Sequence, residues 1–266
     1  MLIRNEQTVV GELCPETALK IQGENIIEES IFFDLEHYLY KKPIAIGVFG
    51  AAVFEEEENA LLSTQYMIEN KKDAKAILEM IKEYFIQKKK EGKNYIVTFS
   101  GNNDFFVINH LFEKYHLDYV FKDEFTHVDL QREYEVRFKK NIGLKNLEKL
   151  YSIERKGELM SGMTIAKTFS KVISDKDYIE RMPKEKIRKI LRYNEQDVVN
   201  LFRIMNRWEK VQIEDVLELE EQLLLEKNEK MERRKILEGN NIEESKLERN
   251  KIEESKIMEM GKRAIE

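Results

Sequence analysis

Three segments rich in β-branched and aromatic residues follow one another early in the chain, and they constrain its fold more than any other feature. They cover residues 30–38, 43–54 and 60–69 and are separated by short polar turns. Apolar runs of this length between turn signals predict strands, and short connections favour antiparallel neighbours. We therefore expect the core to begin with a three-stranded antiparallel meander.

The pattern then changes from strand to helix. Residues 73–90 carry apolar side chains at helical spacing, and the short apolar run 94–101 leads directly into a second helical pattern at 103–116. Another short strand, at 125–131, precedes several helical segments. Strands that run straight into helices are typical of α/β proteins. The predicted fold is thus an α/β mixed sheet of antiparallel and parallel strands, flanked by helices.

Composition divides the chain into three predicted parts. With 42% hydrophobic and 36% charged residues, it can bury a sizeable core beneath a heavily solvated surface. We predict an N-terminal lead-in over residues 1–27, a globular domain over 28–210, and a charged tail over 211–266. The tail pattern indicates a helix or partial disorder, and a helix that contacts a partner protein is the alternative.

Several classes of protein are disfavoured by the same sequence. No run of about 18 apolar residues is present and no signal-peptide core precedes the domain, so a cytoplasmic protein without a membrane span is expected. Cys14 is the single cysteine, and no Cys/His spacing typical of structural zinc occurs. A net charge of -6 argues against a protein that coats nucleic acid, but a local basic patch or bound metal ions would still allow such a partner.

The first predicted strand carries two carboxylates one residue apart. Successive strand side chains point to opposite faces, so Asp34 and Glu36 are expected side by side, with Phe33 and Leu35 facing the other way. Two neighbouring anions repel each other and are costly to desolvate unless a proton or a cation relieves the charge. This pair therefore indicates a candidate metal site.

Two further elements extend this candidate site. Tyr193 and Asp197 are four residues apart, so they share one face of a late helix. Asp104 lies where a Gly-Asn-Asn turn opens a middle helix. Taken singly, Asp104 also fits an N-cap residue and Asp197 also fits a salt-bridged residue beside a core tyrosine.

Together these residues resemble a known family. Asp-x-Glu on the first strand, an acid in a Gly/Asn turn and Tyr-x-x-x-Asp on a late helix look like the DEDD superfamily of ribonuclease-H-like 3′-to-5′ exonucleases. Within it, the DEDDy branch and the YprB-like ribonuclease-H-like domain are the most similar, over about residues 28–208. The motifs in the expected order are VTFSGNNDFFVINHLF, HVDL, GLKNLEKLYSIER, SGMTIAKTF and RYNEQDVVNLF.

The second motif departs from the family pattern. The family reads Asn-x-x-x-Phe-Asp, whereas this chain has Asp104 followed by Phe105. An ungapped alignment places Phe105 at the carboxylate position, and shortening the turn by one residue places Asp104 there. No other nearby acid replaces it, so we prefer Asp104.

The resemblance implies a phosphodiester hydrolase that uses two Mg²⁺ or Mn²⁺ ions. Asp34 would bridge both ions, Glu36 and Asp197 would bind the ion on the side of the nucleophile, and Asp104 would hold the other. Tyr193 would orient the attacking water. Oxygen ligands suit these hard cations, which lower the pKa of a bound water and stabilise the leaving oxygen.

The implied partner is a DNA or RNA end. Lys186 and Lys189 share a helical face with the candidate catalytic residues of the late helix and are candidates for binding phosphate groups. A solvated basic helix start is the alternative for these lysines. For the domain as a whole, the alternative is a catalytically weak or inactive module that binds nucleic acid or protein.

Overall fold

The computed structural model describes residues 1–11, 13–157 and 160–233. The chain divides into two compact units, Met1–Gln212 and Ile213–Glu266. In the second unit residues 213–233 are helical, and residues 234–266 of the predicted tail lie outside the described residues. Among the described helices, none has the length and apolar character needed to span a bilayer.

The first unit is built on a six-stranded mixed sheet with the order β1-β6-β5-β4-β7-β8. Its strands are β1 (Leu2–Val9), β4 (Ser30–Tyr40), β5 (Lys42–Glu55), β6 (Ala60–Met67), β7 (Tyr95–Thr98) and β8 (Thr126–Asp129), and a separate hairpin is formed by β2 (Lys20–Ile21) and β3 (Glu24–Asn25). β4, β5 and β6 pair antiparallel, whereas β7 pairs parallel with both β4 and β8. The predicted meander and the mixed α/β sheet are confirmed.

The edge strand β1 was not predicted. It pairs antiparallel with β6 from Leu2 opposite Met67 to Val9 opposite Ala60, so the N-terminal lead-in contributes a strand to the sheet. Most of its side chains are exposed or only partly buried. An edge strand with one solvated face needs few apolar residues, which explains why its sequence gives little signal.

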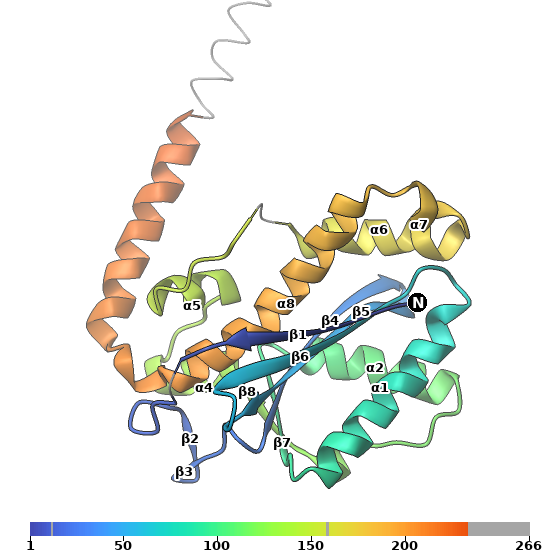
Figure 1. Ribbon diagram of the computed structural model, residues 1–266. Coiled ribbons are helices and arrows are strands. Elements are labelled where there is room, and N and C mark those ends of the chain that lie inside the picture. The colour runs from blue at the N-terminus through green and yellow to red at the C-terminus, as the bar shows by residue number, and fades with distance from the viewer. Residues whose placement is uncertain (12, 158–159, 234–266) are drawn as a thin grey trace, which may run out of the picture. The chain divides into compact units, whose positions relative to one another are not determined.

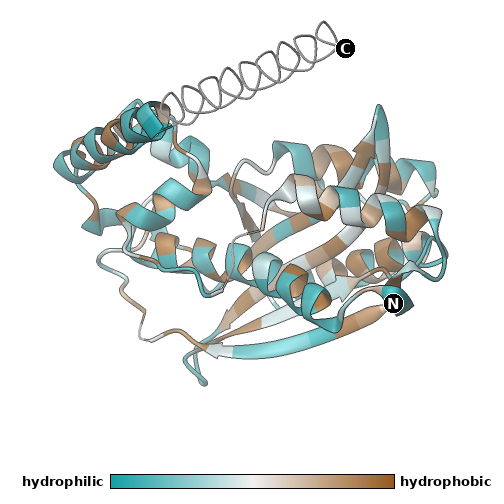
Figure 2. Ribbon diagram, turned by 90° about the horizontal axis from the view of Figure 1, so that it is seen from above, coloured by the Kyte–Doolittle hydropathy of each residue, from teal (hydrophilic) through white to brown (hydrophobic). Residues whose placement is uncertain are grey.

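Helices cover both faces of the sheet. They are α1 (Asp73–Lys90), α2 (Asn102–Lys114), α3 (Phe121–Glu124), α4 (Leu130–Phe138), α5 (Leu144–Leu150), α6 (Gly162–Ser174), α7 (Tyr178–Arg181) and α8 (Lys184–Asn206), followed by a 3₁₀ turn at Trp208–Lys210. α1 and α2 lie on one side of the sheet and α8 crosses the other side (Figure 1). Hydrophobic residues gather on the central strands, while polar residues occupy much of the outer helix surface (Figure 2).

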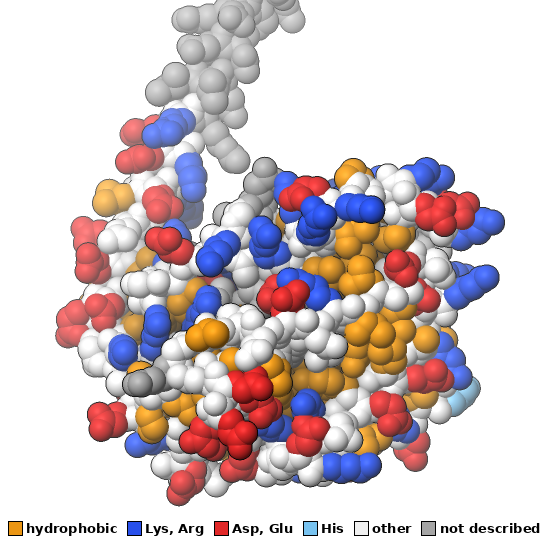
Figure 3. Space-filling view, viewed as in Figure 1, with side chains coloured by type: hydrophobic (Ala, Val, Ile, Leu, Met, Phe, Trp, Pro, Cys, Tyr) orange, Lys and Arg blue, Asp and Glu red, His pale blue; other side chains and the backbone are white. Residues whose placement is uncertain are grey.

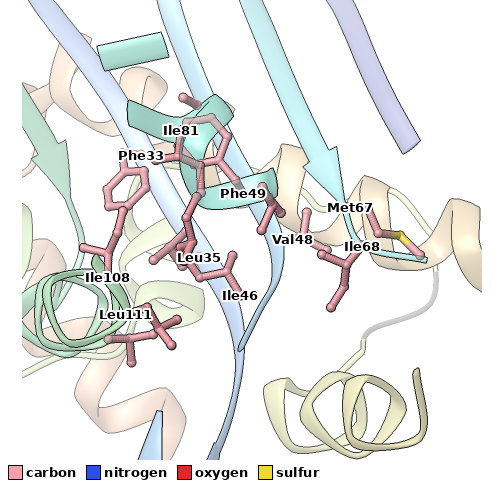
Figure 4. Close-up of a cluster of buried hydrophobic side chains, with 14 of the residues drawn as sticks. Phe33, Leu35, Ile46, Val48, Phe49, Met67, Ile68, Ile81, Ile108 and Leu111 are labelled. Atoms are coloured by element: carbon pink, nitrogen blue, oxygen red, sulfur yellow. The ribbon is translucent and has the colours of Figure 1, made fainter. Parts of the chain in front are cut away.

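One face of β4 belongs to the apolar core beneath α1 and α2. The ring of Phe33 contacts Phe85 of α1 and Phe105 of α2, with ring centroids 5.6 and 6.0 Å apart. Figure 4 shows Phe33 beside Ile81 and Ile108, which come from the same two helices. The odd-numbered residues of β4 therefore fix the sheet against these helices.

The opposite face of β4 meets α8. Phe32 packs edge-on against Phe202 of α8 at 5.6 Å, and Phe54 of β5 stacks on the same ring at 5.4 Å. From Phe32 to Glu36, before the register shifts at His37, the even-numbered residues of β4 thus point toward α8. The predicted alternation is confirmed, and it directs Asp34 and Glu36 to the face that α8 covers.

Candidate metal centre

Three of the predicted ligands meet between β4 and α8. Asp34 and Glu36 come from β4 and Asp197 from α8, and one carboxylate oxygen of each lies within 4.8 Å of the others. Glu36 is 8% exposed and Asp197 5% exposed. Asp34 is partly buried, and three carboxylate oxygens at this separation form an arrangement that a hard divalent cation such as Mg²⁺ or Mn²⁺ can occupy.

Asn194 fixes α8 over the strand and was not singled out from the sequence. Its Nδ2 donates to Oδ2 of Asp34 at 2.9 Å, and its Oδ1 accepts from Nε2 of Gln65 at 2.7 Å. Gln65 also donates to the carbonyl of Leu191 at 2.8 Å. A Cβ on Gly50, which is opposite Asp34 in the sheet register, would lie 2.1 Å from Oδ1 of Asn194. Glycine is therefore required for this close approach.

The environment favours the protonated form of the clustered acids. Burial, and then the charge of Asp104, raises the pKa of Asp34 to about 7. Burial and the charge of Asp34 raise the pKa of Asp197 to about 8. The pKa of Glu36 is also raised well above its ordinary value, mainly by burial and then by Asp34. Without a cation, the cluster thus holds protons at neutral pH, which a bound metal ion would displace.

Asp104 lies beside this cluster but outside the group of three converging oxygens. Its Oδ1 is 4.0 Å from Nδ1 of His37, and burial followed by the charges of Asp129 and Asp197 raises its pKa to about 7. The next residue, Phe105, instead packs in the aromatic core. This division of roles supports Asp104 as the acidic residue of the second motif.

The turn before Asp104 is held by Asp129. Oδ1 of Asp129 accepts from the backbone N–H of Ser100 at 2.8 Å and from that of Gln131 at 3.0 Å, so it also caps α4. Ser100 has a φ of 58°, in the left-handed region. A Cβ on Gly101 would lie 2.2 Å from Oγ1 of Thr98. The turn is therefore tight and leaves no room for a Cβ at Gly101. Asp129 has a structural role, because it holds this turn.

Tyr193 lies one helical turn before Asp197. Its ring is half-buried, and its centroid is 5.3 Å from the Arg155 guanidinium and 5.8 Å from Nζ of Lys145. Burial, and then the charge of Asp197, raises the pKa of the Tyr193 hydroxyl. The phenol therefore stays protonated at neutral pH and can donate a hydrogen bond.

Arg155 enters the centre from the loop after α5 and was missed in the sequence. It forms an ion pair with Asp197, and its Nε and Nη2 donate to the two oxygens of Glu148, each at 2.7 Å. Nδ2 of Asn200 also donates to Glu148 at 2.8 Å. Only Asp197 and Asn200 share a helix, and no helical or strand spacing links them to Glu148 or Arg155, so local patterns do not reveal the network.

The two predicted substrate-binding lysines are placed differently. Lys189 lines a pocket together with Arg155 and Tyr193, whereas Lys186 is not among the residues that line it. The structure therefore associates one of these lysines with the candidate centre.

Comparison with known proteins identifies a superfamily. A sequence model of the RNase H superfamily matches residues 31–209, which include every predicted ligand. No curated protein gives a significant match. The ribonuclease-H-like part of the predicted resemblance is thus confirmed, while the DEDDy branch and the YprB-like domain stay predictions.

Proposed function

The chain belongs to the RNase H superfamily, and from this premise we propose that it is a metal-dependent nuclease that shortens DNA or RNA strands from the 3′ end. The observation that carries the proposal is that Asp34, Glu36 and Asp197 meet between β4 and α8. One carboxylate oxygen of each lies within 4.8 Å of the other two. Such a concentration of carboxylates is costly to ionise without a cation.

Four carboxylates would hold two Mg²⁺ or Mn²⁺ ions in this proposal. Asp34 would contact both ions, Glu36 and Asp197 one of them, and Asp104 the other. When bound, the ions would supply a hydroxide nucleophile and stabilise the charge on the departing 3′ oxygen. The raised pKa values of the acids mean that metal binding would release protons.

Tyr193 would position the attacking water. Its hydroxyl remains protonated, and its place one turn before Asp197 brings it to the rim of the acidic cluster. Asn194 would orient Asp34 by holding Oδ2, which leaves the other oxygen for a ligand. Arg155 would orient Asp197 in the same way, through Oδ1. Asp34 and Asp197 would thus each keep one oxygen for a cation.

The proposal is tested by incubating the full chain with 5′-labelled single-stranded DNA or RNA in a titration of Mn²⁺. We expect a ladder of strands shortened from the 3′ end, and its loss in Asp34→Asn. The matched control is Glu57→Gln, which removes an exposed carboxylate from the turn between β5 and β6 and should leave the ladder unchanged.

A non-catalytic module that binds nucleic acid is the second candidate. It is favoured by the ion pair between Arg155 and Asp197, because the guanidinium already compensates one of the clustered acids. A folded wild-type chain that binds the labelled strand but shortens it at no Mn²⁺ concentration would contradict the nuclease proposal and support the module.

A further inference from the structure

A small pocket beside the acidic centre has an excess of positive charge. Its volume is about 230 Å³, and four cationic side chains line it together with a single acid and a tyrosine. These six residues are Arg155, Lys156, Lys189, Arg192, Glu185 and Tyr193. In the space-filling view, Lys and Arg side chains gather over the first half of α8, where four of these six residues originate (Figure 3). The pocket is therefore suited to an anion.

The pocket adjoins the acidic centre through two shared residues. Arg155 lines the pocket while its guanidinium contacts Asp197, and Tyr193 lines the pocket one helical turn from the same carboxylate. A ligand seated among the cations would thus lie next to the place where the carboxylates converge.

The wall of the pocket is fixed by backbone hydrogen bonds. The N–H of Lys156 donates to Oε1 of Gln196 at 2.6 Å, and Nε2 of Gln196 donates to the carbonyls of Lys156 and Arg192, each at 3.3 Å. Gly157 has a φ of 92°, and a Cβ there would lie 3.5 Å from Nη1 of Arg192. Because the loop is tied to α8, the cations are held near one another before any ligand arrives.

Arg155 gives a second, independent indication of a ligand. Its side chain is only 8% exposed, and its Nη1 is buried without a hydrogen-bond partner among the described residues. Buried N–H groups almost always have an acceptor, and a buried donor without one is costly. Arg155, which lines the pocket, therefore has donor capacity left for a bound anion.

The size of the pocket limits what this anion can be. Pockets for whole small-molecule ligands usually measure about 300–1,000 Å³, and this one is smaller. It is large enough for a phosphate group, while most of a polymer would lie outside it. Lysine and arginine contacts to phosphate oxygens position a nucleic acid without reading its sequence.

We infer that this pocket binds a backbone phosphate of the nucleic-acid strand, adjacent to the phosphodiester at the acidic centre. The inference rests on the proposed function for the identity of the polymer. Lys156 and Arg192 are then substrate-positioning residues.

Metal-free binding tests the inference without requiring cleavage. The full chain in EDTA is titrated against a 5′-fluorescein single-stranded oligonucleotide, and anisotropy is measured. The test variant is the double substitution Lys156→Ala with Arg192→Ala, and the matched control is Lys184→Ala with Lys186→Ala. The control also removes two cations near the start of α8, but neither residue lines the pocket. Thermal melting checks that both variants remain folded.

We expect the pocket variant to weaken binding about tenfold and the control less than about twofold. The slope of log K against log salt should fall by about 0.7 for each phosphate group that the variant no longer neutralises. Glu185→Gln, which removes the acid of the pocket, should strengthen binding. Equal weakening in the pocket and control variants would overturn the inference, because it would indicate a diffuse electrostatic effect.

A neutral linkage locates the contact on the strand. Methylphosphonate is placed at one backbone position at a time near the 3′ end, and wild type should lose affinity mainly at one position. In the pocket variant, methylphosphonate at that position should no longer change the affinity, because the two changes remove the same contact. A uniform profile in wild type would overturn the inference. Competition by inorganic phosphate at the same concentration of phosphate groups would show a free-anion site and would overturn the polymer assignment.

These outcomes separate the inference from the proposed nuclease activity. Wild type that binds through the pocket in EDTA but never shortens a strand in Mn²⁺ contradicts the nuclease and keeps the phosphate site. Wild type that shortens strands while the pocket variant binds and cleaves normally contradicts the phosphate site alone.

Discussion

Asn194 donates a hydrogen bond of 2.9 Å from its side-chain amide to Oδ2 of Asp34, and this bond joins α8 to β4 at the acidic centre. The two residues are 160 positions apart in the chain. Gln65 holds the other end of the amide, so Asn194 has no freedom to turn away. The placement of Asp197 relative to Asp34 therefore depends on a buried polar bridge as well as on apolar packing.

Gly50→Ala is expected to destabilise this bridge. The added Cβ would lie 2.1 Å from Oδ1 of Asn194, which is fully buried and hydrogen-bonded at both ends. Because neither the added methyl group nor the Asn194 side chain can move away freely, the free energy of unfolding should fall by about 1–3 kcal/mol. Urea denaturation measures this change through the transition midpoint.

Gly162→Ala is the matched control for that substitution. Gly162 begins α6, and a Cβ there meets no atom within 4 Å. Alanine should leave stability unchanged or raise it by about 0.4–1 kcal/mol, since it restricts the unfolded chain. If Gly50→Ala behaved like this control, α8 would not be seated on β4 as described.

Titration of the acidic cluster is expected to lower the free energy of unfolding of the metal-free protein as pH rises from about 4 to about 8. In the folded state the pKa values of Asp34 and Asp104 are about 7 and that of Asp197 about 8, against an ordinary value of 3.8. Between these limits the folded chain binds more protons than the unfolded chain. Its free energy of unfolding therefore decreases with pH, and the contribution present below pH 4 is lost above pH 8.

Asp34→Asn isolates this effect from the other acids of the chain. In EDTA it should flatten the pH dependence of the free energy of unfolding. Between pH 5.5 and pH 8 the free energy of unfolding of the variant should rise by on the order of 2 kcal/mol relative to wild type. Mn²⁺ should stabilise wild type at pH 8 by about 2.7 kcal/mol at a hundredfold excess over its Kd, and should not stabilise the variant comparably. Parallel pH profiles for the two proteins would argue against a strained acidic cluster.

Local periodicity was enough to predict part of the site. The strand period separates Asp34 and Glu36 from the core side chains, and the helix period places Tyr193 above Asp197. Both rules act within one element, so a single sequence reveals them. The meander and the strand-to-helix transition were predicted for the same reason, because each depends on the order of neighbouring segments.

The missing parts depend on contacts between elements. Asn194 matters because Gly50 lies beneath it, and that proximity follows from the docking of α8 rather than from any spacing. Arg155 meets Glu148 and Asp197 across a loop, where no period applies. Polar residues that form such bridges look like surface residues in a sequence, which explains why they were missed.

Asp104→Asn should separate the two alignments of the second motif. If Asp104 is the acidic residue of that motif, the substitution should lower the rate of strand shortening in Mn²⁺ roughly a hundredfold or more, with the fold intact. Phe105→Leu should instead lower stability, because the ring packs with Phe33 and Phe121, and should leave cleavage measurable. Glu113→Gln changes an exposed acid of the same helix and serves as the control. Normal cleavage by Asp104→Asn would remove it from the ligand set.

Arg155→Met is expected to destabilise the metal-free protein by about 3–5 kcal/mol, since it leaves buried acids without their cation. Glu148 is only 3% exposed at its side chain and receives both of its ion-pair hydrogen bonds from Arg155. Arg181→Met is the control, because the pair of Arg181 with Asp175 is exposed and should contribute no more than about 1 kcal/mol. Urea denaturation in EDTA at pH 7 measures both changes.

A double-mutant cycle shows whether the loss comes from the ion pair or from the volume of the arginine. Glu148→Gln removes the charge that Arg155 neutralises, while its amide oxygen can still accept from Asn200. If the penalty is electrostatic, Glu148→Gln combined with Arg155→Met should recover about 1–3 kcal/mol relative to the sum of the single changes. Additive losses would mean that the charge pair of Arg155 with Glu148 contributes no net stabilisation, and that the loss in Arg155→Met has another origin.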